Sequence, residues 1–177
     1  MSFNVWGTLA PNEGQQIIGG DATPYRTIIA NSEVITIGDA VQWDAGGFLV
    51  NDASVGAVAG IVVGVANSGV PVAPDSATTG TYTVASNNQT VAQIYAIIDI
   101  STDTLYSAPA DAALGTTTGS NLPGYLMDLL ASGSATQLDE STASATTGQF
   151  FSWGLDPRNS ERVIVNLNER IGNASVS

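Results

Sequence analysis

Short runs in which apolar and polar residues alternate, separated by glycine- and proline-containing turns, follow one another from residue 27 onward. Successive side chains of a strand point to opposite faces, so this alternation is typical of half-buried β-strands. The pattern predicts strands at residues 27–30, 33–37, 40–43, 48–50, 55–66, 81–85, 90–100, 149–155 and 162–169. Short strands without a convincing long helix predict a mainly β fold with a small β-barrel or sandwich core.

Two of these runs predict the interior of the fold. Residues 90–100 are apolar at every second position and partly apolar between, which is typical of a strand buried on both faces. Residues 55–66 carry glycines at the small-xxx-small spacing of membrane helices. The run is rich in Val and Ile and falls short of the ~20 residues that a spanning helix needs. We therefore predict a buried strand with glycine bulges there.

The remaining segments lack a clear period. Residues 1–26 are interrupted by several Gly and Pro residues and predict an extended N-terminal arm, followed by one β domain over residues 27–177. Residues 70–80 and 101–122 are expected to be loops. Residues 123–131 fit either a helical turn or a short strand, and the Ser/Thr/Ala/Gly-rich stretch 132–148 fits either a long surface loop or an irregular edge strand.

Three residue types are missing from the 177-residue chain: Cys, His and Lys. Their absence excludes disulfides, thiolate and imidazole catalysis, Schiff-base chemistry and a P-loop lysine. Asp99, Asp103 and Asp111 do not follow the spacing of a calcium-binding loop, and Asp139 and Glu140 are adjacent rather than set across a cleft. We expect turn and strand-end aspartates, no catalytic residue, no metal site and no cofactor.

Charge limits the partners. The formal net charge is −12, and the four basic residues are all arginines. Nucleic acids and anionic membranes are bound through clustered cations, so neither is an expected partner. Charged residues make up only 11% of the chain, well below the roughly 25% of ordinary soluble domains. Such a neutral polar surface is common in subunits that pack against one another.

Two groups of residues are candidates for contacts with other protein subunits. Arg158 and Arg162 lie in a short arginine-rich stretch and either pair within the chain, with Asp156, Glu161 or Glu169, or bridge to a neighbouring subunit. Apolar side chains of the predicted arm either anchor it to a partner or pack onto their own barrel. The candidate contact residues are Phe3, Val5, Trp6, Arg26, Arg158 and Arg162.

The order of several segments resembles that of head-decoration (cement) proteins of tailed bacteriophages. The segments are residues 33–49 (EVITIGDAVQWDAGGFL), 61–66 (IVVGVA), 93–99 (QIYAIID), 105–108 (LYSA), 137–141 (QLDES), 150–158 (FFSWGLDPR) and 163–168 (VIVNLN). The resemblance implies a non-enzymatic β subunit without a cofactor. It further implies that the subunit forms a homotrimer and binds the major capsid protein on the outer capsid surface of the virion.

Other functions remain open at this point. A tail or fibre component would share the structural role, although no repeat or coiled stalk is seen in the sequence. A carboxylate-dependent carbohydrate hydrolase would be favoured by clustered Trp residues and by paired acids on neighbouring strands, whereas the three Trp residues are scattered along the chain. A carbohydrate-binding surface module is a further alternative.

Overall fold

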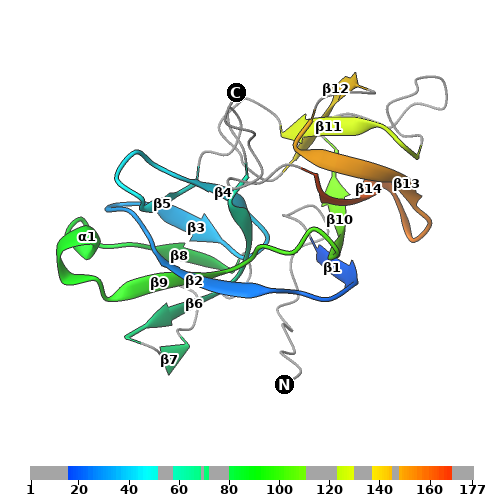
Figure 1. Ribbon diagram of the computed structural model, residues 1–177. Helices are drawn as coiled ribbons and strands as arrows, with labels where there is room; N and C mark the ends of the chain where they lie inside the picture. Colours follow the sequence, from blue (N-terminus) through cyan, green and yellow to red (C-terminus); the bar gives the residue numbers. More distant parts are fainter. Residues whose placement is uncertain are drawn as a thin grey trace.

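The computed structural model describes residues 16–51, 58–68, 70–71, 80–110, 123–129, 137–144 and 148–168. These residues form a mainly β protein, as the alternating pattern predicts (Figure 1). Two sheets of six strands lie side by side, and a two-stranded sheet accompanies one of them. Within the described residues, no helix is long and apolar enough to cross a membrane.

The first sheet, called here the curled sheet, is antiparallel and bends back on itself. Its strand order is β2 (Pro24–Ile28), β9 (Ile94–Asp99), β6 (Gly60–Asn67), β4 (Ala40–Trp43) and β5 (Leu49–Val50), with β7 (Val70–Pro71) paired to β6. A parallel bridge between Ile29 and Leu49 links the end of β2 to β5. The strands at the two ends of the order are thereby brought together, which gives the sheet its barrel-like curvature.

The second sheet, called here the C-terminal sheet, is also antiparallel. Its order is β1 (Gln16–Gly19), β10 (Leu105–Pro109), β14 (Asn159–Leu167), β13 (Phe150–Asp156), β11 (Leu126–Leu129) and β12 (Leu138–Ser144). The two-stranded sheet of β3 (Val34–Thr36) and β8 (Thr81–Thr83) belongs to the other half of the molecule, beside the curled sheet (Figure 1).

The core has two parts that meet at β4 and β6. Inside the curled sheet, the side chains of Ile35, Val41, Leu49, Val62 and Ile98 are buried together. A second cluster joins the two sheets, because Ala40, Val58 and Ile61 pack with buried residues of the C-terminal sheet. Those residues are Tyr106, Ala108, Met127, Leu129, Leu138, Phe150, Val163, Val165 and Leu167. Burial of apolar surface on both sides of β4 and β6 therefore holds the two halves together.

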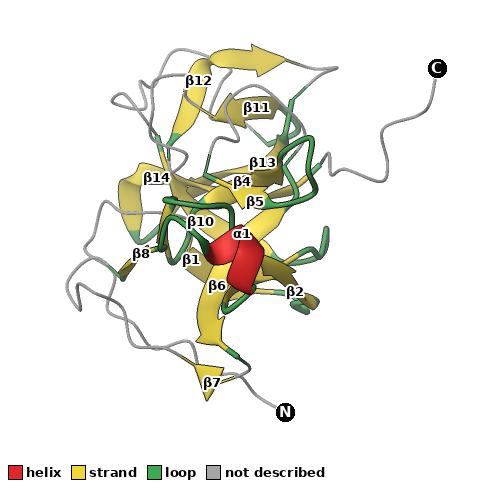
Figure 2. Ribbon diagram, turned by 90° about the vertical axis from the view of Figure 1, so that its left-hand side faces the viewer, coloured by secondary structure: helices red, strands yellow, loops and turns green. Residues whose placement is uncertain are grey.

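The predicted central strand 90–100 begins later than expected. Asn88–Val91 form a single helical turn, α1, and Ala92 adopts a left-handed conformation with φ of 48° before β9 starts at Ile94. The buried Asn88 side chain explains the change: its Nδ2 donates to the carbonyls of Ile29 (2.7 Å) and Ile94 (2.9 Å), and its Oδ1 accepts from the Ile94 N–H (2.8 Å). This turn lies on the side of the molecule away from the C-terminal sheet (Figures 1 and 2).

The loop expected at residues 101–122 contains a strand that the periodicity missed. β10 lies between β1 and β14 in the C-terminal sheet. Its residues Tyr106, Ser107 and Ala108 are all buried. A buried serine breaks the alternation that marks a strand in sequence. Of the segments left open, 123–131 holds a strand rather than a helical turn, and 132–148 holds an edge strand whose pairing with β11 is irregular.

Part of the segment before residue 27 belongs to the two sheets. Gln16–Gly19 pair with β10, and β2 begins at Pro24, three residues before the predicted strand. Residues 1–15 of the predicted arm lie outside the described residues.

The glycine-rich run behaves as a bulged, buried strand from Gly60 onward, as its composition predicts; residues 55–57 lie outside the described part. The register of β6 against β9 shifts between Val62 and Gly64. Gly60 is required by close approach, since a Cβ added there would lie 2.5 Å from the carbonyl oxygen of Asp99.

Candidate functional site

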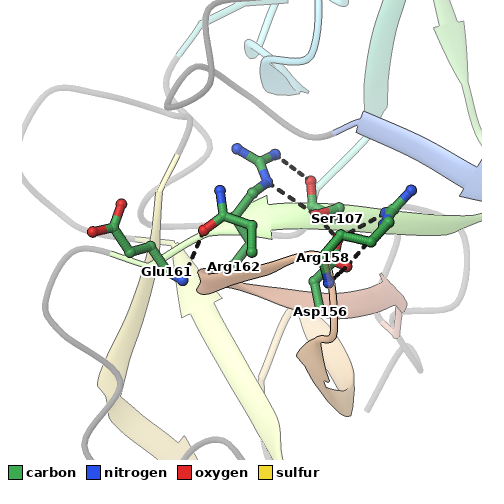
Figure 3. Close-up of polar contacts among 6 residues, drawn as sticks. Ser107, Asp156, Arg158, Glu161 and Arg162 are labelled. Atoms are coloured by element: carbon green, nitrogen blue, oxygen red, sulfur yellow. Dashed lines mark hydrogen bonds and ion pairs between the residues drawn. The ribbon is translucent and has the colours of Figure 1, made fainter.

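Four polar residues of the C-terminal sheet form the most developed cluster of charged contacts that the structure describes, called here the arginine cluster. Ser107 lies on β10, Asp156 ends β13, Arg158 sits in the turn that follows, and Arg162 lies on β14 (Figure 3). The turn is local in origin, because Asp156 Oδ1 accepts the backbone N–H of Arg158 at 2.9 Å, a bond that aspartate often makes two residues ahead.

Arg158 and Asp156 make a forked ion pair. Arg158 Nε donates to Asp156 Oδ1 at 2.9 Å, and Nη2 donates to Oδ2 at 2.7 Å. The Asp156 side chain is 2% exposed, whereas that of Arg158 is 63% exposed. The hydrogen bond from Arg158 holds the pKa of Asp156 far below its usual range, and the same bond raises the pKa of Arg158.

Arg162 is the buried cation of the cluster, with only 3% of its surface exposed. Its Nε donates to Ser107 Oγ at 2.9 Å, and its Nη2 donates to the Ser107 carbonyl oxygen. Ser107 Oγ in turn donates to Asp156 Oδ2 at 2.6 Å. Burial lowers the pKa of Arg162, and the nearby Asp156 carboxylate counteracts that effect.

The cluster therefore links three strands through one carboxylate and two guanidinium groups. Because Asp156 already accepts from Arg158 and Ser107, its carboxylate is not poised as a base toward solvent. The arrangement is that of a structural brace, in which the Ser107 hydroxyl links a buried arginine to a buried carboxylate.

The sequence left two alternatives for these arginines. Arg158 pairs within the chain with Asp156, one of the acids that the first alternative names. Arg162 contacts Ser107 and lies inside the described protein, away from its surface. Glu161 uses its backbone N–H to donate to Asn159 Oδ1 at 3.0 Å, and Glu169 lies outside the described residues.

The other predicted contact residues are separated from this cluster. Arg26 is exposed on β2, and its guanidinium carbon lies 3.8 Å from the centre of the Tyr95 ring, a cation–π contact. Within the part of the chain that the structure describes, Arg26 makes no ion pair. Phe3, Val5 and Trp6 lie outside the described residues, so their contacts stay a prediction.

Asp99, the best-described of the aspartates considered as calcium ligands, makes structural hydrogen bonds instead. Asp99 ends β9 and is buried; its Oδ1 accepts from the backbone N–H groups of Thr23 (2.7 Å) and Ser101 (3.0 Å), and its Oδ2 accepts from the Tyr106 hydroxyl (2.6 Å). Burial, and secondarily Asp99, raises the pKa of Tyr106 well above its ordinary value. Asp103 lies in the turn before β10, Asp139 lies on β12, and Asp111 is outside the described residues.

No three His, Cys, Asp or Glu side chains come together as a metal-binding group anywhere in the described ranges. Several of the acidic residues accept hydrogen bonds from backbone N–H groups at strand ends and turns, as Asp99 and Asp156 do. Asp44 is a further example: its Oδ1 accepts from the backbone N–H groups of Gly46 (2.8 Å) and Phe48 (2.9 Å) and so fixes the β4–β5 turn.

An aromatic surface on β13 was missed by the sequence reasoning. Trp153 is 54% exposed, and its indole Nε1 donates to Asn166 Oδ1 at 2.8 Å. The Phe151 ring packs edge-on against it, with ring centroids 5.1 Å apart. A signal was present in the segment FFSWGLD, where Phe151 and Trp153 alternate with the buried Phe150 and Ser152.

Compared with known protein families, with curated proteins and with solved structures, the chain matches none of them.

Proposed function

We propose that the protein is a non-enzymatic virion structural subunit that binds the outer surface of an assembled phage capsid lattice and stabilises it. The observation that carries this proposal is the placement of the segments that resemble decoration proteins. Together they supply β3 to β6, β9, β10, β13 and β14, which is to say the framework of both sheets and their shared core. The resemblance therefore concerns one coherent β body rather than scattered turns.

The polar contacts support a structural role. The side chains that are best placed for chemistry, Asp99, Tyr106 and Asp156, accept or donate hydrogen bonds that join neighbouring strands or the two sheets. Buried and satisfied groups of this kind stiffen a fold and favour one arrangement. A stiff subunit loses little conformational freedom when it attaches to a lattice, which favours binding.

Stabilisation of a lattice would follow from mass action. A subunit that binds the assembled shell better than its separated components shifts the equilibrium toward the shell. We propose that the protein does so as a homotrimer in contact with the major capsid protein, because several linked contacts raise the overall affinity. The net charge of −12 would keep decorated particles apart in solution.

The test uses purified protein and heads assembled without it, from the phage whose genome encodes it. The protein is expected to sediment with the heads and to raise the temperature at which they release DNA, measured with an intercalating dye. Light scattering is expected to give three times the 18.0 kDa chain mass. Heads that neither bind the protein nor become more heat-resistant would overturn the proposal.

Arg158 offers a sharper variant than Arg162 for this test. Its guanidinium pairs with Asp156 but is 63% exposed, so a neighbouring subunit can reach it, whereas Arg162 is buried. R158E is expected to weaken attachment to heads more than R26E if the C-terminal sheet faces the lattice, and less if β2 does. Deletion of residues 2–10 tests the predicted arm: attachment should fall while the thermal unfolding of the free protein is unchanged.

A further inference from the structure

We infer that the surface around Trp153 is a binding site for a neutral carbohydrate. The site consists of Phe151, Trp153 and Asn166, called here the aromatic platform. Trp153 and Phe151 come from β13 and Asn166 from β14, next to them in the C-terminal sheet. Glycan binding at this platform does not depend on attachment to a capsid, so the two proposals can fail separately.

The indole is exposed but not free to turn. Its only polar atom, Nε1, is bonded to Asn166 Oδ1, and the edge-on Phe151 ring packs beside it. Asn166 is itself held, because its Nδ2 donates to the carbonyl oxygen of Thr102 at 2.7 Å. Since Nε1 is already satisfied, the exposed part of Trp153 is ring hydrocarbon and not a hydrogen-bonding edge. A ring fixed in this way binds a flat ligand without losing rotamer freedom on binding.

The exposed area favours a small ligand over a protein partner. An aromatic side chain offers about 150–250 Å² of surface, so a half-exposed indole presents on the order of 100 Å². A stable protein interface buries about 800 Å² on each partner. The area does match one face of a sugar ring, whose axial C–H groups stack on the electron-rich face of an indole.

Charge narrows the ligand class further. Phe151, Trp153 and Asn166 are uncharged, and the chain as a whole carries a net charge of −12. Anionic polysaccharides and nucleic acids would be repelled by the surrounding protein. A neutral sugar is not repelled, and its hydroxyl groups have an amide side chain, Asn166, beside the ring.

Affinity electrophoresis tests this with named probes. The intact protein is run in native gels that contain hydroxyethyl cellulose, laminarin or galactomannan, and in a gel that contains the polyanion alginate. Retardation is expected in at least one neutral gel and not with alginate. W153A should raise the Kd in that gel about tenfold or more, because truncation of a stacked aromatic side chain removes most of its contact with the ligand. W153F keeps an aromatic ring, so its Kd should lie between those of the wild-type protein and W153A.

The matched control is Tyr25→Ala, because Tyr25 is an aromatic residue of similar exposure (48%) on the other sheet. Y25A should be retarded like the wild-type protein. Thermal unfolding of each variant shows whether it is folded. If W153A does not fold, the loss of binding is measured with W153F instead. Three results would overturn the inference: no retardation in any neutral gel, equal retardation of the wild-type protein and both Trp153 variants, or retardation by alginate alone.

Discussion

The hydroxyl group of Tyr106 donates a 2.6 Å hydrogen bond to Asp99 Oδ2, and both side chains are buried. Asp99 ends β9 of the curled sheet, and Tyr106 lies on β10 of the C-terminal sheet. The bond therefore joins the two sheets at the point where the chain passes from one to the other. The two carboxylate oxygens of Asp99 accept three hydrogen bonds in all, which explains why this aspartate is tolerated in the interior.

Removal of this hydroxyl should destabilise the protein. Y106F leaves Asp99 Oδ2 buried without its donor, so the free energy of unfolding is expected to fall by about 1–3 kcal/mol in urea denaturation. The control is Y25F, which alters an exposed tyrosine and should change stability by less than about 0.5 kcal/mol. Equal effects of the two variants would show that the bond contributes nothing to the junction between the sheets.

Asp156 should make stability depend on acid pH. Its pKa is lowered in the folded protein, mainly by the hydrogen bond from Arg158, relative to about 3.9 in an unfolded chain. Its contribution is thus fully present above about pH 4 and is lost as the pH falls from there toward the folded pKa. D156N should be less stable than the wild-type protein by about 1.5–3 kcal/mol near neutral pH, measured by urea denaturation.

The difference between D156N and the wild-type protein should begin to shrink as the pH is lowered to about 3, because the unfolded wild-type chain takes up a proton at Asp156 while the folded protein keeps the carboxylate ionised. Asp103 is exposed, so D103N serves as the control and is expected to follow the wild-type protein at both pH values. A gap between D156N and the wild-type protein that stays constant with pH would contradict the assigned direction of the pKa.

The two arginines of the arginine cluster should differ in their effect on stability. R162A removes a buried cation that donates to the Ser107 hydroxyl and carbonyl groups, and it should cost about 1.5–3 kcal/mol, as expected when hydrogen bonds from a charged group are lost. R158A removes a solvent-exposed side chain and should cost less, because water screens the ion pair. Thermal or urea unfolding of both variants gives the order; a larger loss for R158A would show that Arg162 does not brace the sheet.

Two glycines of β6 should respond differently to alanine. G60A places a methyl group against the Asp99 carbonyl oxygen and is expected to lower stability by about 1–3 kcal/mol. At Gly64 the nearest atom to an added Cβ is a methyl carbon of Ile97 at 3.7 Å, an ordinary contact. G64A is therefore the matched control and should be neutral or slightly stabilising in thermal unfolding. If G60A is also neutral, β6 and β9 are not as close there as described.

Local patterns predicted the elements whose two faces differ. The β4–β5 hairpin follows from Val41 and Trp43 alternating before an Asp-Ala-Gly-Gly turn, and β14 follows from Val163, Val165 and Leu167. Alternation failed where a polar residue is buried, as at Ser107 on β10. It also failed where a side chain ends one element and fixes the next, as Asn88 does between α1 and β9.

In the candidate site, too, the sequence indicated contacts between neighbouring residues but not contacts between distant ones. Pairing of Arg158 with Asp156 was one of the alternatives that the sequence left open, and the two residues are two positions apart. Arg162 and Ser107 are 55 residues apart, and their contact has no local signature. The alternation in FFSWGLD places Phe151 and Trp153 on one face of the strand, but it does not reveal which of the two faces another layer will cover, so the exposure of Trp153 came only from the structure.

By itself, the sequence determined that the protein is mainly β, anionic, and without imidazole, thiol or amine side chains, because composition and the period of two are properties of the chain alone. Only the tertiary structure decided which polar groups are buried and which aromatic residues face solvent. Burial depends on strands far apart in the chain, such as β10 with β14 and β9 with β2, and those pairings come from packing that no local pattern encodes.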